Sequence, residues 1–163
     1  MTARLTGDWD KLKLTLGRLP AELRQAGVLA TRQAALMLRG AIQEGIRDQA
    51  PGGVAFEKLS PVTIKHKKSS KALIDKGDLL RSISVRFGKS GLWAFIGVLR
   101  SARNRKSKAL VNIALVHEYG SATKKQHIPA RPFIRPTFRQ LKPKLKEHFR
   151  KAIEGVVRKA GRP

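Results

Sequence analysis

Apolar residues recur with a helical period across the first third of the chain. Between Leu23 and Ile46, small and aliphatic side chains return every three or four residues, close to the period of an α-helix. Pro20 suits the first helical turn, and the Ala-Pro-Gly-Gly run at 50–53 ends the pattern. We therefore predict one long helix over residues 20–49, preceded by an N-terminal arm of residues 1–19.

The hydrophobic period switches to two at the start of a segment covering residues 82–120. Every second residue from Ile83 to Phe87 is apolar, a Gly-containing turn occupies 88–91, and the apolar run LWAFIGVL follows. Two such runs across a four-residue loop predict an antiparallel β-hairpin. The later stretch 109–119 is apolar enough for either a strand or a short helix.

A polar connection over residues 50–81 joins the helix to the hairpin. Ser60 is expected to cap a short helix starting at Pro61, because its hydroxyl can accept a hydrogen bond from a backbone N–H of the first turn. The tract from Lys65 to Lys71 is rich in basic residues and Ser and contains no acid. This composition is typical of an exposed, mobile loop.

The last segment, residues 127–160, combines a Pro-rich stretch with a second helical pattern. Apolar residues from Leu141 to Val157 recur at helical spacing, and Lys and Arg dominate the remaining face. Pro143 lies inside the pattern and should kink this helix or delay its start. We expect a single α+β domain over residues 1–163, with a long N-terminal helix and a C-terminal helix packed on a small antiparallel β-sheet.

The charge balance is the strongest compositional signal. The chain has 35 Lys and Arg residues against 11 Asp and Glu, for a formal net charge of +24. Self-repulsion at this charge costs stability, so we expect an anionic partner: nucleic acid, an acidic protein surface or an anionic membrane. The chain has no Cys, no apolar run of about 20 residues that could span a bilayer, and no secretory signal pattern. These features favour a protein made in a cytoplasm and not inserted in a membrane.

Candidate metal chemistry centres on the segment VHEYGSATKKQHIPARPFIRPTF, which contains the adjacent pair His117 and Glu118. A zincin helix needs H-E-x-x-H, and Ser121 stands in the place of the second His. The other His residues lie in different types of segment, so three ligands are not expected to converge on a metal. We interpret His117 and Glu118 as a structural hydrogen-bonded pair and expect no metal and no other cofactor.

The sequence also lacks the motifs of other common kinds of active site. The chain contains neither a G-x-S-x-G motif nor the Gly spacing of a phosphate-binding loop. Asp75 and Asp78 form the one close carboxylate pair in an ordered-looking place, and they flank Gly77. We expect this pair to cap the following turn. The sequence therefore predicts no enzyme activity.

Non-specific binding of nucleic acid is the physical alternative. The loop RSARNRKSK, the Lys65–Lys71 tract and the C-terminal helix all carry basic residues that can follow phosphates. No helix-turn-helix spacing or aromatic stacking platform is present, so any DNA contact should be independent of sequence. The candidate contact residues are Arg100, Arg103, Arg105, Lys106 and Lys108.

Two segments together resemble a known family. LSPVTIKHKKSSKALIDKGDLLRSI is similar to a signature of phage virion-morphogenesis proteins, with Lys76 where Thr is usual. VHEYGSATKKQHIPARPFIRPTF resembles the HEFGT…IPARPFLRP signature shared by that family and the tail-completion proteins of lambdoid siphophages. Tyr119 replaces the usual Phe there, and Ser121 the usual Thr. The order and spacing of the two blocks match, and the resemblance extends over residues 20–160.

The resemblance implies a small α+β structural subunit in the neck or tail top of a tailed phage virion. Such subunits assemble as a ring, typically a hexamer, that completes the tail and joins it to the head connector. The implied partners are further copies of the chain, other neck and head-connector proteins, and tail proteins. Genomic DNA passing through the lumen of the ring would face the Arg100–Lys108 loop.

The second of these segments, residues 116–138, is called the signature segment below, and its prolines suit a rigid architecture. Pro129 and Pro132 fix φ and force the residues before them into extended conformations. The result is a stiff strut that delivers Phe133 to a core or a neighbouring subunit, with Arg131 and Arg135 available for carboxylates.

Gly120 is expected to serve a backbone turn that a side chain would hinder. We predict a subunit or partner interface at the following residues: His117, Glu118, Tyr119, Gly120, Ile128, Pro129, Ala130, Arg131, Pro132 and Phe133.

We favour the ring-forming tail-completion subunit among the functional hypotheses. A tail terminator, which also caps a tail tube without catalysis, and a non-specific basic DNA-binding protein are the alternatives. A metal-dependent hydrolase built on His117 and Glu118 ranks last, because the further ligands are missing.

Overall fold

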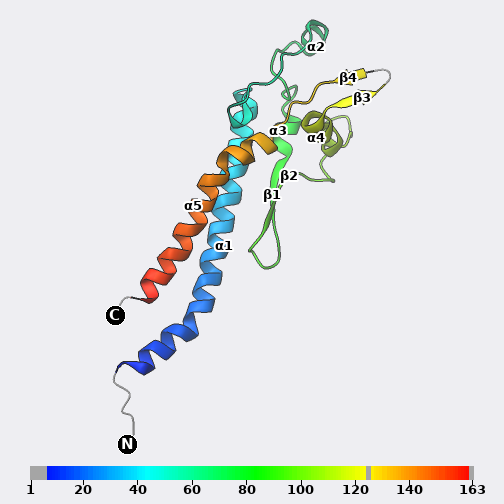
Figure 1. Cartoon of the computed structure of the whole chain (residues 1–163). Helices are drawn as coiled ribbons and strands as arrows, with labels where there is room; N and C mark the ends of the chain where they lie inside the picture. Colours follow the sequence, from blue (N-terminus) through cyan, green and yellow to red (C-terminus); the bar gives the residue numbers. More distant parts are fainter. Residues whose placement is uncertain (1–6, 124–125, 162–163) are drawn as a thin grey trace, which may run out of the picture.

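A long helical stem carries a head of short elements at one end (Figure 1). The computed structural model describes residues 7–123 and 126–161. In chain order the elements are α1 (Trp9–Arg47), η1 (Pro51–Gly53), α2 (Pro61–Lys67), α3 (Asp78–Ser82), β1 (Ile83–Phe87), β2 (Ala94–Val98), α4 (Leu110–Tyr119), β3 (Ser121–Thr123), β4 (Gln126–Ile128) and α5 (Arg135–Ala160). The predicted α+β class, with long N- and C-terminal helices and a small antiparallel sheet, is confirmed.

Helix α1 is longer than the sequence pattern predicted. It begins at Trp9, where the carboxylate of Asp8 accepts a hydrogen bond of 3.1 Å from the Lys11 N–H and caps the first turn. The predicted arm over residues 1–19 is therefore wrong from Trp9 onward. Pro20 lies inside the helix and not at its start. Figure 1 shows a bend in the blue, N-terminal part of α1, as expected where a proline removes one backbone hydrogen bond.

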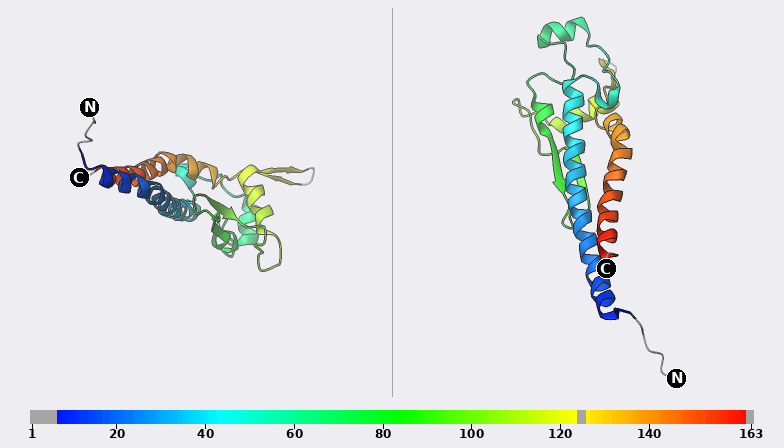
Figure 2. Two further views of the ribbon diagram at one scale, coloured as in Figure 1. Left: turned by 90° about the horizontal axis from the view of Figure 1, so that it is seen from below. Right: turned by 90° about the vertical axis from the view of Figure 1, so that its left-hand side faces the viewer.

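The stem consists of α1 and α5, which lie side by side and antiparallel (Figure 2). Helix α5 starts at Arg135 with Pro136 in its first turn, a position where proline costs no hydrogen bond. It continues through Pro143, so that proline does not delay the start of the helix. Small residues of α1, Ala30 and Ala34 among them, are buried and allow neighbouring elements to approach closely.

The predicted hairpin is confirmed. Strands β1 and β2 pair antiparallel in a register that joins Ile83 to Val98 and Phe87 to Ala94. The turn between them packs on α1, where Leu92 lies close to Gly27. The stretch that sequence patterns left open between strand and helix forms α4. Strands β3 and β4 form a second, separate antiparallel pair.

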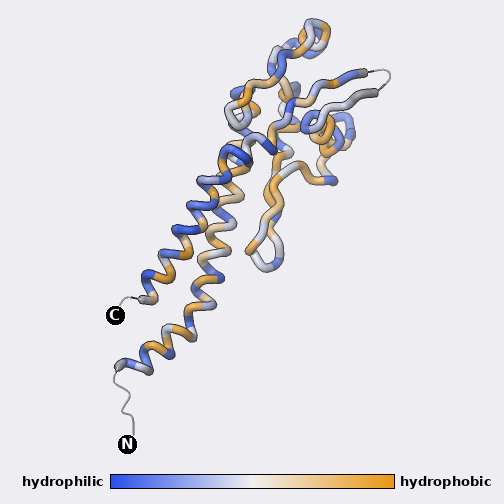
Figure 3. The backbone as a smooth tube through the Cα atoms, viewed as in Figure 1, coloured by the Kyte–Doolittle hydropathy of each residue, from blue (hydrophilic) through white to orange (hydrophobic). Residues whose placement is uncertain are grey.

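The main core lies where the head meets the stem. Ile42, Ile46, Ile83 and Phe133 are fully buried there and come from three distant parts of the sequence. Figure 3 shows apolar residues gathering at this junction. The core fixes the hairpin and the Pro-rich segment to the upper half of α1.

The polar connection is more ordered than a plain loop. Ser60 caps α2 as predicted, since its hydroxyl accepts from the Thr63 N–H at 3.3 Å and Pro61 opens the helix. Further along, the Gln49 side chain pairs with both backbone groups of Ala72, which is buried. No helix in the part of the chain that the structure describes is long and apolar enough to cross a membrane.

Two glycines allow the stem helices to converge at η1. A Cβ on Gly45 of α1 would lie 2.6 Å from the Cα of Pro51. A Cβ on Gly52 would lie 2.4 Å from the carbonyl carbon of Pro136 in α5, and Gly52 also has a positive φ of 66°. Both contacts involve backbone atoms, so they cannot be relieved by moving a side chain.

Gly45→Ala and Gly40→Ala should therefore change stability in opposite directions. Both residues lie inside α1, where Ala is a better helix former than Gly by about 1 kcal/mol. Gly40 has open space around its Cα, so Gly40→Ala should raise the free energy of unfolding. Gly45→Ala should lower it by about 1–3 kcal/mol, because the new methyl group meets the backbone of Pro51. Urea unfolding of both variants measures the difference, and equal changes would contradict the close contact.

Candidate functional site

Three consecutive residues at the end of α4 point in three directions. Successive side chains of a helix are about 100° apart, which separates His117, Glu118 and Tyr119. His117 faces a cleft beside α2 and α3, Glu118 is 6% exposed, and Tyr119 is 63% exposed. In the described part of the chain His117 and Glu118 share no hydrogen bond, so the predicted His-Glu pair is wrong.

The Glu118 carboxylate caps the first turn of α5. One oxygen accepts from the backbone N–H groups of Phe133 at 2.9 Å and Ile134 at 3.0 Å, and the other accepts from Arg135 at 3.0 Å. The N-terminal N–H groups of a helix have no partner within the helix, and a negative charge there is favourable. Ile134, at the N-cap position, makes no side-chain cap. Glu118 therefore supplies from α4 the cap that α5 lacks.

Arg135 adds a charge contact to the same carboxylate. Its guanidinium lies 3.6 Å from Glu118 and its central carbon is 4.4 Å from the ring centre of Tyr119. The prediction that Arg135 contacts a carboxylate is confirmed, and the cation–π geometry holds the exposed Tyr119 ring in place.

Arg131 has a different role from the predicted one. Its side chain is buried and donates to the carbonyl oxygens of Glu57 at 2.9 Å and Lys58 at 3.1 Å. Its backbone N–H donates to the carbonyl of His117 at 2.7 Å. Arg131 thus ties the connection before α2 to the end of α4, and it binds carbonyl groups where a carboxylate was expected.

The turn at Gly120 and the delivery of Phe133 to a core are as the sequence predicted. Gly120 has a φ of 78°, and a Cβ there would lie 3.1 Å from the carbonyl oxygen of Ile128. After β4 the chain runs through Pro129 and Pro132 to Phe133, whose side chain is fully buried in the core of its own subunit.

The predicted interface therefore needs a correction. Glu118, Arg131 and Phe133 are buried within the subunit and are not available to another one. Their polar groups satisfy the backbone of the same chain, which is the physical reason for their burial. For the other residues of that set, an interface stays a prediction: His117, Tyr119, Gly120, Ile128, Pro129, Ala130 and Pro132. Tyr119 and Ala130 are the exposed members.

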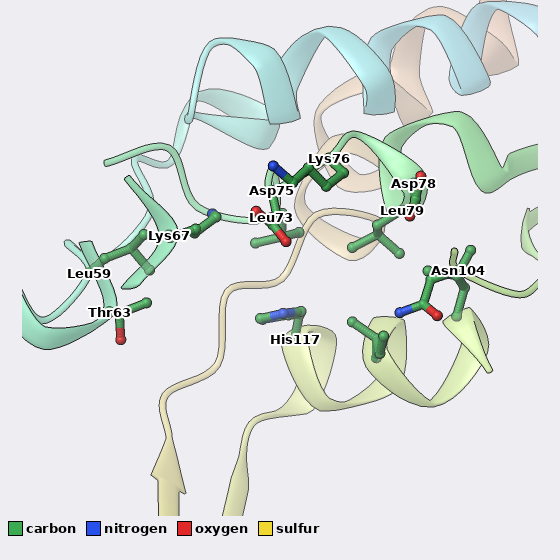
Figure 4. Close-up of a pocket in the computed structure, with 12 residues that line it drawn as sticks. Leu59, Thr63, Lys67, Leu73, Asp75, Lys76, Asp78, Leu79, Asn104 and His117 are labelled. Carbon is green, nitrogen blue, oxygen red and sulfur yellow. The ribbon is translucent and has the colours of Figure 1, made fainter. Parts of the chain in front are cut away.

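His117 lines a cleft of about 320 Å³ between α2, α3 and α4 (Figure 4). Apolar residues such as Leu73 and Leu79 form much of its wall, and Lys67 and Asp75 lie at its polar side. The Nδ1 atom of His117 is buried without a hydrogen-bond partner. Burial first, and then the charges of Arg131 and Lys67, lower the pKa of His117. The ring is therefore neutral near neutral pH.

The cleft does not resemble a metal site. Among the described residues, no group of three or more His, Asp or Glu side chains is placed to hold a metal ion. Lys67, whose pKa is lowered chiefly by burial, donates to the carbonyl of Lys71.

The Arg100–Lys108 loop is held to α3. The backbone N–H of Arg105 lies 3.4 Å from one Asp78 oxygen, and its guanidinium lies 3.5 Å from the other. Arg103 donates to two carbonyl groups of its own loop. The five candidate DNA contacts are all exposed, but these two are engaged within the chain. The predicted capping by Asp78 is wrong, since Gly77 occupies the N-cap of α3 without a side-chain bond.

An apolar groove lies beside the signature segment, between β2, α4 and the start of α5. Its volume is about 250 Å³, and Phe95, Leu115 and Tyr119 stand at its sides. These three side chains are 45%, 51% and 63% exposed. Sequence reasoning missed this surface. The available signal was the run LVNIALVHEY, which is too apolar for one side of a helix to bury.

Glu118→Ala should destabilise the fold strongly. Three backbone N–H groups at the start of α5 would lose a charged acceptor, and we expect the free energy of unfolding to fall by about 3 kcal/mol or more. Glu118→Gln keeps one acceptor oxygen and should cost less. The control Glu44→Ala removes an exposed carboxylate of α1 and should change stability by at most about 0.5 kcal/mol. Urea unfolding compares the three, and equal values for Glu118→Ala and Glu44→Ala would refute the cap.

His117 should make stability depend on pH in a mildly acidic range. Its folded pKa is lowered, so the unfolded chain binds the proton more readily, with a pKa of about 6.5. Stability is then retained above that pH and lost progressively as the pH falls below it. Unfolding of wild type and His117→Gln between about pH 7.5 and pH 5 should show a smaller loss in the variant. His66→Gln, at an exposed site, should behave as wild type; the same loss in all three proteins would contradict the assignment.

Comparison with known proteins agrees with the resemblance of the two signature segments. A family model described as the phage virion morphogenesis family matches residues 7–160, which is nearly the whole chain. No curated protein and no solved structure matches the chain. The match includes α1, the buried Glu118 cap, the strut and α5. The chain belongs to the phage virion morphogenesis family.

Proposed function

We propose that this protein is a ring-forming tail-completion subunit in the neck of a tailed phage, where it joins the tail to the head connector. Membership of the family supports a structural role in building the virion. The proposed partners are further copies of the chain, in a ring of six by analogy with the family, together with neck, head-connector and tail proteins. In this role the protein performs no catalysis and uses no cofactor.

The observation that carries the proposal is the exposed apolar groove next to the signature segment. Phe95, Leu115 and Tyr119 leave about half of their area in water. Contiguous exposed apolar surface is rare on a monomer and marks interaction sites. The buried Glu118 cap fixes the end of α4 and thereby the positions of Leu115 and Tyr119. The family signature thus contributes Tyr119 to this surface and fixes its position.

A second apolar surface lies far from the first. Trp9, Leu12 and Leu16 recur at helical spacing on the part of α1 below the hairpin, and about half of each side chain is exposed. A closed ring built head to tail needs two different, complementary surfaces on every subunit. The groove on the head and this surface on the stem meet that requirement. We propose that each subunit inserts the lower end of its α1 into the groove of the next.

Burial of both apolar surfaces also has to overcome electrostatic repulsion between subunits of net charge +24. A free subunit that stays monomeric until it docks in the neck is consistent with this balance, since partner surfaces or DNA would then screen the charge.

Acidic substitutions in the groove should block assembly while leaving the subunit folded. In a phage carrying Leu115→Asp and Tyr119→Asp we expect filled heads and finished tails that fail to join, as in a deletion of the gene. Electron microscopy of lysates counts joined particles. Leu36→Asp, at an equally exposed site outside both apolar surfaces, serves as the matched control and should give normal virions.

The outcome of this experiment tests the proposed interface and the neck function separately, and it distinguishes tail completion from a tail terminator. Normal virions from the groove variant, with thermal unfolding of the purified protein unchanged, would overturn the proposed interface. Normal virions from the gene deletion would overturn the neck function itself. Tails of uncontrolled length would indicate a tail terminator.

A further inference from the structure

Helix α5 carries a row of basic side chains on its outer side. Arg139, Lys142 and Lys146 are spaced by three and four residues, so they lie on one side of the helix, and all three are exposed. Among the ion pairs and hydrogen bonds of the described residues, none involves these three side chains. Figure 3 shows hydrophilic residues along much of α5, and Figure 1 places this helix on the side of α1 opposite the β1–β2 hairpin.

The acids of α5 do not neutralise this row. Arg150 forms ion pairs with both Glu147, at 2.6 Å, and Glu154. Hydrogen bonds from Arg150 lower the pKa of Glu147. Both acids are thus engaged in the C-terminal half of the helix. The N-terminal half, residues 135–146, has five Lys or Arg residues and no acid.

Some basic side chains elsewhere are held by their own chain. In α1, the Arg32 guanidinium lies 5.9 Å from the ring centre of Phe87, and Arg39 donates to the carbonyl of Ile83 at 2.9 Å. In the Arg100–Lys108 loop, Arg103 and Arg105 are engaged as described above. A partner that binds those side chains has to displace existing contacts, whereas the α5 row is free of them.

We propose that Arg139, Lys142 and Lys146 bind the phosphate backbone of double-stranded DNA without regard to its sequence. Seven residues of helix separate the first from the last, or about 10 Å along the axis. Phosphates of one DNA strand follow each other about every 3.4 Å along the duplex axis, so the row covers about three of them. The inference rests on the charge and geometry of α5 and holds whether or not the subunits form a ring.

The composition of the row favours DNA over an acidic protein. Protein interfaces are depleted in Lys and place apolar or aromatic residues at their centre, whereas interfaces with DNA are polar and strongly positive. On that side of the helix, Pro143 is the apolar residue that lies between Arg139 and Lys146, and no aromatic side chain does. Lys and Arg without a base-reading element supply affinity but no sequence information.

Two variants with the same change of charge test the proposal. One replaces the row, R139Q/K142Q/K146Q, and the other replaces exposed residues of the loop, R100Q/K106Q/K108Q. Gln is about as good a helix former as Lys and Arg, so α5 should stay helical, and circular dichroism checks this. The full-length protein is titrated with a short fluorescent duplex at salt concentrations from about 50 to 200 mM. The measured quantity is the slope of log K against log salt concentration.

For the row variant we expect the slope to become shallower by about 2 to 3, since each lost phosphate contact reduces it by about 0.9. The loop variant should change it by less than about 1. The charge-retaining R139K/K142R/K146R should keep the wild-type slope, and a second duplex of different sequence should bind equally well.

Three results would overturn the proposal. The first is an equal or larger effect of the loop variant, which would mean that net charge or the loop carries binding. The second is an absence of salt-dependent binding by the wild type. The third is competition by polyglutamate as effective as that by duplex DNA of equal charge, which would assign the row to an acidic protein partner.

Discussion

The carboxylate of Glu118 is the interaction on which the relation between head and stem depends. It comes from the last turn of α4 and accepts hydrogen bonds from three consecutive backbone N–H groups where α5 begins. A buried charge is costly unless it is fully hydrogen-bonded, and here the unpaired helix amides supply the donors that it needs. The carboxylate thereby accepts the hydrogen bonds that the helix amides have to donate, and the amides stabilise the buried charge. The direction of α5 follows from this contact, because the first turn of the helix is fixed to the end of α4.

Around this contact, other residues of the signature segment hold neighbouring parts of the same subunit in place. Gly120 ends α4 with a φ of 78°, the Pro-rich segment leads to the buried Phe133, and Arg131 holds the connection that leads into α2. Each of these residues contacts the backbone of a different part of the same subunit. A segment whose His and Glu first indicated chemistry is therefore architectural. The exposed apolar groove lies beside it, between β2, α4 and the start of α5.

Sequence periodicity was sufficient for the elements whose signals are local. The hairpin at Ile83–Val98, the cap at Ser60 and the second long helix all follow from patterns within a few residues. The start of α1 was misplaced because Pro20 is a strong local signal for a first turn, although the weaker cap at Asp8 determines the actual start. The roles of Glu118 and Arg131 were out of reach for a different reason. Their partners lie 15 to 17 and 73 to 74 residues away, and only the folded chain brings them together.

The two glycines at the top of the stem, Gly45 and Gly52, also affect the direction of the long stem helices. Gly45 and Gly52 let η1 fit between α1 and the first turn of α5 with backbone touching backbone, so little freedom is left at the point where the two helices converge. Helix α1 extends about 58 Å from Arg47 to Trp9. Over that length, a change of about 5° in helix direction would displace the lower end by about 5 Å, roughly the rise of one helical turn. The position of the lower end of the stem therefore depends on the backbone contacts of Gly45 and Gly52 at its upper end.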